Sequence, residues 1–147
     1  MVRGYRALKV ARVVQRVKGV PTEYQTAYEE RQVTEALRVA KHYFDLSNER
    51  KLEEIKKLFT PSSTYSSANT GLYLGADQIM DMQTTFYASF DTMHWEVHRV
   101  EEVKPGIVLF DFTFSGSSRD GQTVWPGWEY VIVYNGKLQH VEVRNKD

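Results

Sequence analysis

One acidic residue interrupts the most apolar run of the chain. Asp111 lies between Ile107 and Phe114, in a stretch that is otherwise mostly apolar. An ionised carboxylate is costly in such surroundings unless another group pairs with it, and functional carboxyl groups often occupy sites of this kind. Asp111 is therefore a candidate catalytic acid or base. The alternative is that its side of the strand is partly open to solvent.

A second candidate for acid–base chemistry stands near the end of the chain. His140 and Glu142 are two residues apart in a segment of alternating residue types, so in a strand their side chains share one face. An imidazole beside a carboxylate can exchange protons near neutral pH. Val141 and Val143 offer the more apolar face, which favours a solvated position for the pair and leaves a catalytic position as the alternative.

Large aromatic residues gather in the second half of the chain. Trp95 stands at the start of one expected strand, and Trp125, Trp128 and Tyr130 cluster around Pro126-Gly127 in a later one. Rings of this size line apolar pockets that contain few polar groups, but they also fill cores and dimer interfaces. We take Trp95, Trp128 and Tyr130 as candidate ligand-binding residues, with packing in a core or an interface as the alternative.

The elements that would position these residues begin with helices. Apolar residues recur at helical spacing from Gln32 to Leu46, from Leu52 to Phe59 and from Asp77 to Tyr87. Pro61 stops the second helix, and Asp77 is a candidate cap for the third.

Strands are expected after the helices. Residues 62–67 are polar and extended, Gly71 and Gly75 flank a turn, and everything beyond the third helix alternates as a strand does. Hairpin turns are indicated at Lys104-Pro105-Gly106, Arg119-Asp120-Gly121 and Asn135-Gly136. Helices followed by long antiparallel strands indicate the α+β class.

Several segments resemble the NTF2-like superfamily, in its SnoaL-like and ketosteroid-isomerase-like branch. The string YFDLSNERKLEEIKKLF, from Tyr43 to Phe59, resembles the first two helices of that family. Thr64-Tyr65, the Gly75–Ile79 opening of the third helix and the closing VIVYNGKLQHVEV fit the same pattern, over residues 32–144. The resemblance implies a cone-shaped NTF2-like (cystatin-like) fold, with N-terminal helices packed on a strongly curved antiparallel sheet.

The resemblance also implies where an isomerase site would lie. In isomerases of this type, a tyrosine of the first helix and a second acid form an oxyanion hole, and an aspartate moves the proton. Here Tyr43 takes the tyrosine position, the base position falls on Ser67, and the second acid falls near Tyr130. A serine hydroxyl needs a partner to act as a base, so the isomerase mechanism does not carry over. Tyr43 and Ser67 are kept as candidate ligand-binding residues.

The net charge of zero conceals an uneven distribution of basic residues. Of nineteen Lys and Arg, six lie between Met1 and Val20, where there is no Asp or Glu. We expect residues 1–30 to form a basic N-terminal extension and residues 31–147 to form the NTF2-like domain. The extension has the composition of a loosely held terminus or of a targeting or membrane-surface segment. Without targeting, the expected location is the cytoplasm.

Several kinds of site are not expected. The chain lacks cysteine, which excludes disulfides and thiolate zinc sites. His94 and His98 have no third ligand nearby, so no metal is expected, and without a glycine-rich phosphate loop no cofactor is expected. The acidic body argues against nucleic acid, and no apolar run reaches the ~18 residues of a membrane span.

Three functions of different classes fit these observations. One is binding of a small hydrophobic molecule in an aromatic-lined pocket. Another is a cyclase, isomerase or dehydratase that uses Asp111 or His140 with Glu142. The third is a dimeric assembly domain whose cavity is incidental. The resemblance itself implies a homodimer that pairs through the outer faces of its sheets.

Overall fold

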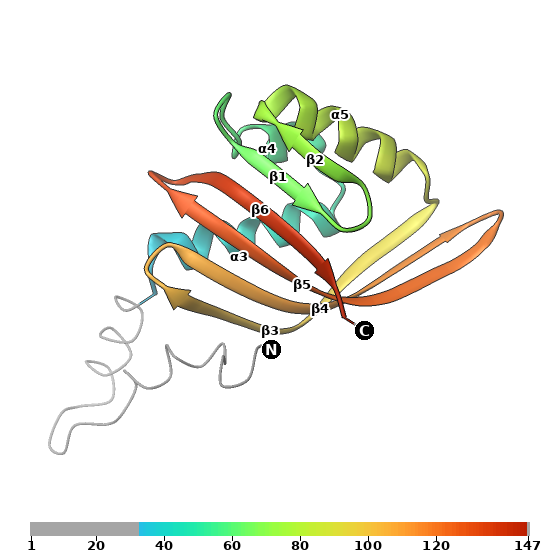
Figure 1. Cartoon of the computed structure of the whole chain (residues 1–147). Coiled ribbons are helices and arrows are strands. Elements are labelled where there is room, and N and C mark those ends of the chain that lie inside the picture. Colours follow the sequence, from blue (N-terminus) through green and yellow to red (C-terminus); the bar gives the residue numbers. More distant parts are fainter. Residues whose placement is uncertain (1–32, 147) are drawn as a thin grey trace, which may run out of the picture.

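Three helices and six strands make up residues 33–146, the part of the chain that the computed structural model describes (Figure 1). The helices are α3 (Glu35–Asn48), α4 (Leu52–Lys56) and α5 (Gly75–Ala88). The strands are β1 (Thr64–Ser67), β2 (Gly71–Leu74), β3 (Thr92–Lys104), β4 (Ile107–Ser118), β5 (Gly121–Tyr134) and β6 (Lys137–Asn145). The α+β class is confirmed. The basic extension predicted for residues 1–30 lies outside the described residues.

Helix α3 forms where the first helical pattern was predicted. The Thr34 side chain caps it by accepting a hydrogen bond from the backbone N–H of Leu37 at 3.1 Å. Its buried face includes residues that recur at helical spacing, namely Leu37, Ala40, Tyr43, Phe44 and Ser47. None of the helices within residues 33–146 has both the length and the apolar character that a membrane crossing demands.

Helix α5 begins slightly before its predicted cap. Gly75 has a φ of 85°, which turns the chain from β2 into the helix. The Gln78 side-chain oxygen accepts a hydrogen bond from the backbone N–H of Leu74 at 3.0 Å. Asp77 therefore lies in the first turn and not at the cap. In the first turn its negative charge interacts favourably with the helix dipole.

The sheet is mixed, with strand order β2-β1-β6-β5-β4-β3. Strand β1 is antiparallel to β2 but parallel to β6, so the predicted antiparallel sheet contains one parallel pair. The chain leaves β1 through β2 and α5, builds β3, β4 and β5 from the far edge, and returns as β6 in the direction of β1 (Figure 1). The turn expected between Gly71 and Gly75 is instead the short strand β2.

The long strands are joined by tight turns at the predicted places. Asn135 and Gly136 have φ values of 50° and 72°, as a two-residue type I′ turn requires. Gly106, between β3 and β4, has a φ of 82°, and a Cβ there would lie 3.0 Å from the Val133 carbonyl oxygen. These turns fix the register in which neighbouring strands place their side chains.

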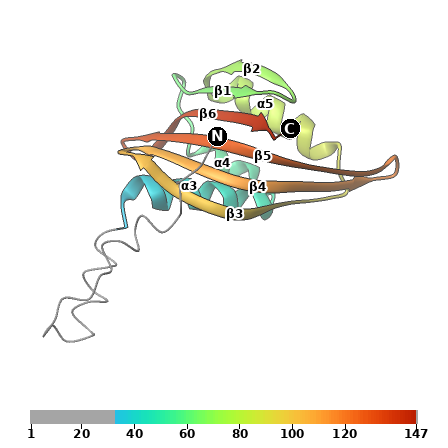
Figure 2. The same cartoon turned by 60° about the horizontal axis from the view of Figure 1, so that its bottom comes forward.

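The sheet curves around α3 and keeps the helices on its concave side (Figure 2). Phe44 of α3 stacks on Phe110 of β4, with ring centroids 3.9 Å apart. On β4 the residues of the concave face are fully buried, namely Val108, Phe110, Phe112 and Phe114. The cone-shaped architecture implied by the resemblance is confirmed.

The opposite face of the same strands carries a second, smaller apolar cluster. Leu109 of β4 and Val103 of β3 are buried there, and Ile107, Trp128 and Tyr130 pack against them. Because side chains alternate along a strand, each of β4 and β5 contributes to both faces. This alternation decides which candidate residues reach the interior of the cone.

Candidate functional site

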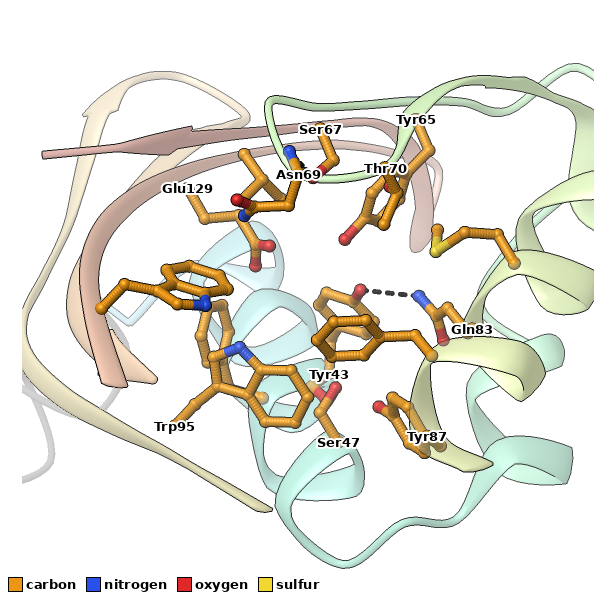
Figure 3. Close-up of a pocket in the computed structure, with 15 residues that line it drawn as sticks. Tyr43, Ser47, Tyr65, Ser67, Asn69, Thr70, Gln83, Tyr87, Trp95 and Glu129 are labelled. Atoms are coloured by element: carbon orange, nitrogen blue, oxygen red, sulfur yellow. Dashed lines mark hydrogen bonds between the residues drawn. The ribbon is translucent and has the colours of Figure 1, made fainter. Parts of the chain in front are cut away.

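A cavity of about 40 Å³ lies between the concave face of the sheet and helices α3 and α5 (Figure 3). A cavity of this size holds a few water molecules. The fifteen residues that line it are Tyr43, Phe44, Ser47, Tyr65, Ser67, Asn69, Thr70, Met82, Gln83, Phe86, Tyr87, Trp95, Trp125, Glu129 and Val143. Seven of them are aromatic, so the wall is mostly apolar and rigid.

Trp95 and Trp125 form one side of this wall. The Trp95 ring lies 5.9 Å from the ring of Tyr87 and 5.0 Å from that of Phe114. Trp125 stacks on Phe114, also at 5.0 Å between centroids. Because each ring packs against neighbouring rings, the two indoles are held in place on the cavity wall.

Tyr43 and Gln83 form the hydrogen-bonded pair of the site (Figure 3). The Gln83 side-chain amide donates to the Tyr43 hydroxyl at 2.9 Å, and both residues are buried. The other end of that amide, Oε1 of Gln83, is buried without a hydrogen-bond partner among the described residues. An unpaired buried acceptor is costly, so the Gln83 amide lowers the stability of the fold while its N–H holds the Tyr43 hydroxyl in place.

The three tyrosine hydroxyls of the site stay protonated at neutral pH. Burial raises the pKa of Tyr43 and of Tyr65 well above the ordinary value, and raises that of Tyr87 to about 12. The Tyr43 and Tyr65 hydroxyls both lie toward the middle of the cavity (Figure 3). The wall therefore offers neutral hydroxyl groups to a ligand.

Glu129 of β5 is the acidic residue of the cavity wall. Its side chain is 5% exposed, and its carboxyl group points into the cavity (Figure 3). It makes no hydrogen bond or ion pair with any side chain of residues 33–146. Burial raises the pKa of Glu129 from 4.5 to about 8, so a carboxyl group able to exchange a proton near neutral pH faces the rings.

The sequence missed Glu129 by one residue. The second acid of the isomerase pattern was placed near Tyr130, which is adjacent in the chain but faces the other side of the sheet. The structure places Trp128 and Tyr130 around Leu109, away from the cavity, and so corrects the orientation expected for them. Strand alternation is the reason, because a shift of one residue exchanges the two faces.

Tyr43, Ser67 and Trp95 do lie on the cavity wall, as the sequence placed them. Ser67 accepts a hydrogen bond from the backbone N–H of Asn69 at 3.1 Å through its hydroxyl oxygen. In the described part of the chain no carboxylate or imidazole contacts this hydroxyl, so nothing there would take its proton.

Asp111 lies on the opposite face of the sheet, where basic side chains surround it. Its carboxylate accepts a hydrogen bond from Lys146 Nζ at 2.5 Å and lies 3.5 Å from Arg99 Nη2. The Lys146 ammonium also lies 5.7 Å from the centre of the Trp128 ring. The burial of Asp111 is thus offset by ion pairs, and the expected place of this residue in the pocket is corrected.

His140 and Glu142 contact each other but not the cavity. His140 Nε2 lies 3.0 Å from Glu142 Oε1, and His140 Nδ1 lies 2.7 Å from the Thr64 hydroxyl. Arg144 forms a further ion pair with Glu142. Val141 and Val143 take the inward positions of β6, so the pair lies on the other face of the strand, where the two side chains are 27% and 23% exposed.

The comparison of the sequence with protein families finds one match. The description of the SnoaL-like domain fits residues 40–141 of the chain. That segment includes α5, β1 to β5, most of α3 and the greater part of β6, and with them every element of the cavity wall. Among curated proteins, none matches the chain.

Solved structures with the same fold bind or process different molecules. TerC, co-crystallised with polyporic acid, shares 14% identity over 77% of this chain and 92% of its own, with a TM-score of 0.66. An LEH-like epoxide hydrolase of M. tuberculosis shares 11% identity over 76% of this chain and 83% of its own, with a TM-score of 0.68. A protein of Catenulispora acidiphila DSM 44928 has a ketosteroid isomerase-like fold and is in complex with trimethylamine. It shares 12% identity over 72% of this chain and 83% of its own, with a TM-score of 0.65.

Proposed function

Because this chain belongs to the SnoaL-like family, we propose that it binds a small, mostly apolar molecule in the cavity and holds that molecule's polar group at Glu129. The carboxyl group of Glu129 carries the proposal, since it is buried, faces aromatic rings and has no partner among the described side chains. A buried polar group without a partner is costly, and a ligand that pairs with it removes that cost.

The way into the cavity supports this proposal. An open groove between α5 and the β1–β2 hairpin shares Thr70, Met82 and Phe86 with the cavity wall. Met82 is a flexible side chain, and Phe86 is only partly buried, so a movement of these two joins the groove to the cavity. TerC with polyporic acid and the Catenulispora protein with trimethylamine are examples of this fold holding small molecules.

Binding can be tested with the tryptophans of the chain as reporters. The sequence has three of them; Trp95 and Trp125 line the cavity, whereas Trp128 lies on the opposite face. Titration with compact probes (tert-butanol, acetone and tetramethylammonium chloride) is expected to shift the indole N–H signals of Trp95 and Trp125 in ¹H–¹⁵N NMR spectra.

Trp128 serves as the internal control in this titration, and Trp95→Phe and Trp125→Phe assign the signals. A probe that moves only the Trp128 signal binds elsewhere. If none of the probes moves the Trp95 or Trp125 signal at millimolar concentration, the proposed binding function is wrong.

A second function is favoured by the pKa of Glu129. A carboxyl group whose pKa is about 8 can give up and take back a proton near neutral pH, as a general acid or base must. For an enzyme of the cyclase, isomerase or dehydratase type, Glu129 therefore replaces Asp111, His140 and Glu142 as the residue that would move the proton.

We also propose that two copies of the chain associate through the outer face of the sheet. Trp128, Tyr130 and Ile107 are only partly buried there, beside the buried Leu109. A partly apolar face of this kind gains stability when a second copy covers it. Light scattering at micromolar concentration is expected to give twice the 17.1 kDa mass of one chain.

Trp128→Arg is expected to shift the protein to the monomer, because it places an unpaired charge in the interface. Leu72→Arg is the matched control, since Leu72 is an apolar residue of β2 that is already 65% exposed. A monomeric mass for the unaltered protein, or dissociation by the control alone, would contradict pairing through this face.

A further inference from the structure

One buried acceptor faces the cavity without a hydrogen-bond donor. The carboxyl group of Glu129, a residue that is 5% exposed, points into the cavity (Figure 3) and has no partner among the described side chains. Since buried acceptors are normally paired, a ligand could bring the donor that this carboxyl group lacks.

The cavity also lacks a positive charge. Among the fifteen described residues of its wall there is no Lys, Arg or His, and Glu129 is the acidic one. The other titratable groups that face Glu129 are Tyr43 of α3, Tyr65 of β1 and Tyr87 of α5, whose raised pKa values keep them neutral. An ionised Glu129 therefore has no counter-ion of its own within the wall.

Aromatic rings surround the same space. Trp95 and Trp125 line it, and tyrosine and phenylalanine rings complete the wall. The face of an aromatic ring attracts a cation, most strongly when water is excluded, and such rings are the usual surroundings of bound alkylammonium groups. Rings and carboxylate thus favour the same kind of occupant.

We propose that the cavity selects a compact organic ammonium ion, whose charge Glu129 balances and whose N–H, where it has one, donates to the Glu129 carboxylate. This inference rests on the proposed binding function and names its ligand class. A neutral carbonyl compound fits less well. It would accept a hydrogen bond from a protonated Glu129 but would leave an ionised Glu129 without a counter-ion in the wall.

Calorimetric titration with probes of matched size tests whether the cavity prefers a positively charged ligand. Tetramethylammonium has a permanent charge, and tert-butanol is its neutral counterpart. Tetramethylammonium is expected to bind at least tenfold more tightly than tert-butanol at pH 9. Its affinity should fall roughly tenfold for each pH unit below about 8, because a proton then competes with the cation for Glu129. This dependence of the affinity on pH can be measured with the unaltered protein alone.

Two substitutions test the residues. Glu129→Gln is expected to weaken tetramethylammonium binding about 100-fold, while tert-butanol binding changes little. Glu96→Gln removes an exposed carboxylate of β3 and is the matched control. Trimethylammonium, which has an N–H, should bind about tenfold more tightly than tetramethylammonium at pH 8, and Glu129→Gln should reduce that difference.

The outcomes separate this inference from the binding function. If tert-butanol or acetone binds as tightly as the cations, or if Glu129→Gln leaves cation affinity unchanged, the ammonium inference is overturned and the binding function stands. If no probe binds, both are overturned. Both are supported if the cation affinity falls in Glu129→Gln and falls with decreasing pH as described.

Discussion

Glu129→Gln is expected to raise the free energy of unfolding of the ligand-free protein, and to raise it more at high pH. In the folded protein the pKa of Glu129 is about 8, against 4.5 for an ordinary glutamate. Between these two values the folded state keeps a proton that the unfolded state has lost. The stability of the unaltered protein therefore falls as the pH rises through this window.

The size of the effect follows from the width of the window. Each pH unit costs at most about 1.4 kcal/mol, so the loss is about 5 kcal/mol once the pH exceeds 8. Glutamine has no proton to lose, but its buried amide is no better paired than the carboxyl group. We therefore expect variant and parent to lie within about 1 kcal/mol of each other at pH 5, and the variant to be about 4 kcal/mol more stable at pH 9.

Urea unfolding at pH 5, 7 and 9 measures this difference. Glu96→Gln, which removes an exposed carboxylate, should show no gain that grows with pH. Equal pH slopes for Glu129→Gln and the parent would mean that the Glu129 carboxyl group is solvated in the folded protein. The binding proposal would then lose the observation that carries it.

Such a gain in the free energy of unfolding would show that the buried carboxyl group destabilises the ligand-free protein. A carboxyl group buried among rings lowers the stability of the empty fold, and glutamine at the same position would relieve most of that cost. Sites that bind or react often keep residues of this kind, at the expense of stability. The cost is recovered when a ligand pairs with the group, so a ligand that binds the ionised form should stabilise the protein most at high pH.

Local patterns predicted the elements of this fold well. The helical spacing of Leu37, Tyr43 and Phe44 placed α3, and the alternation of β4 placed its phenylalanines on one face. The Asn135-Gly136 turn was predictable because few other residue pairs adopt two positive φ angles in succession. Each of these signals lies within a few neighbouring residues.

The pairing of β1 with β6 had no such signal. Thr64 pairs with His140, and the two residues are separated by most of the domain. Hydrophobic patterns show which face of a strand is buried, but they do not identify the neighbouring strand or its direction. A sequence that ends in long hairpins therefore suggested an antiparallel sheet, and the parallel contact appeared only in three dimensions.

The site differs from the prediction for another reason. The size of the Trp128 and Tyr130 rings favours the interior for both, whereas the charged Glu129 between them is the residue that lines the cavity. The alternation of β5 contained the correction, because Val131 and Val133 face the core and counting back in steps of two reaches Glu129. Residue size and polarity suggested one face of the strand, whereas strand periodicity identified the correct one.

Phe110→Ala is expected to destabilise the protein by about 3–5 kcal/mol, because it removes a buried ring from the contact between α3 and the sheet. Phe110 is 1% exposed, and its ring stacks on Phe44 with 3.9 Å between centroids. Phe44 also lines the cavity, so the space left by Phe110 would loosen one wall of the site.

Urea unfolding measures this loss at a single pH, with Tyr134→Ala as the control. Tyr134 is an aromatic residue of β5 that is 66% exposed, and its removal should change stability by no more than about 0.5 kcal/mol. Tetramethylammonium affinity should fall in Phe110→Ala and stay unchanged in the control, because only Phe110 supports a residue of the cavity wall. A loss below about 1 kcal/mol would mean that α3 is held to the sheet by contacts other than this stacked pair.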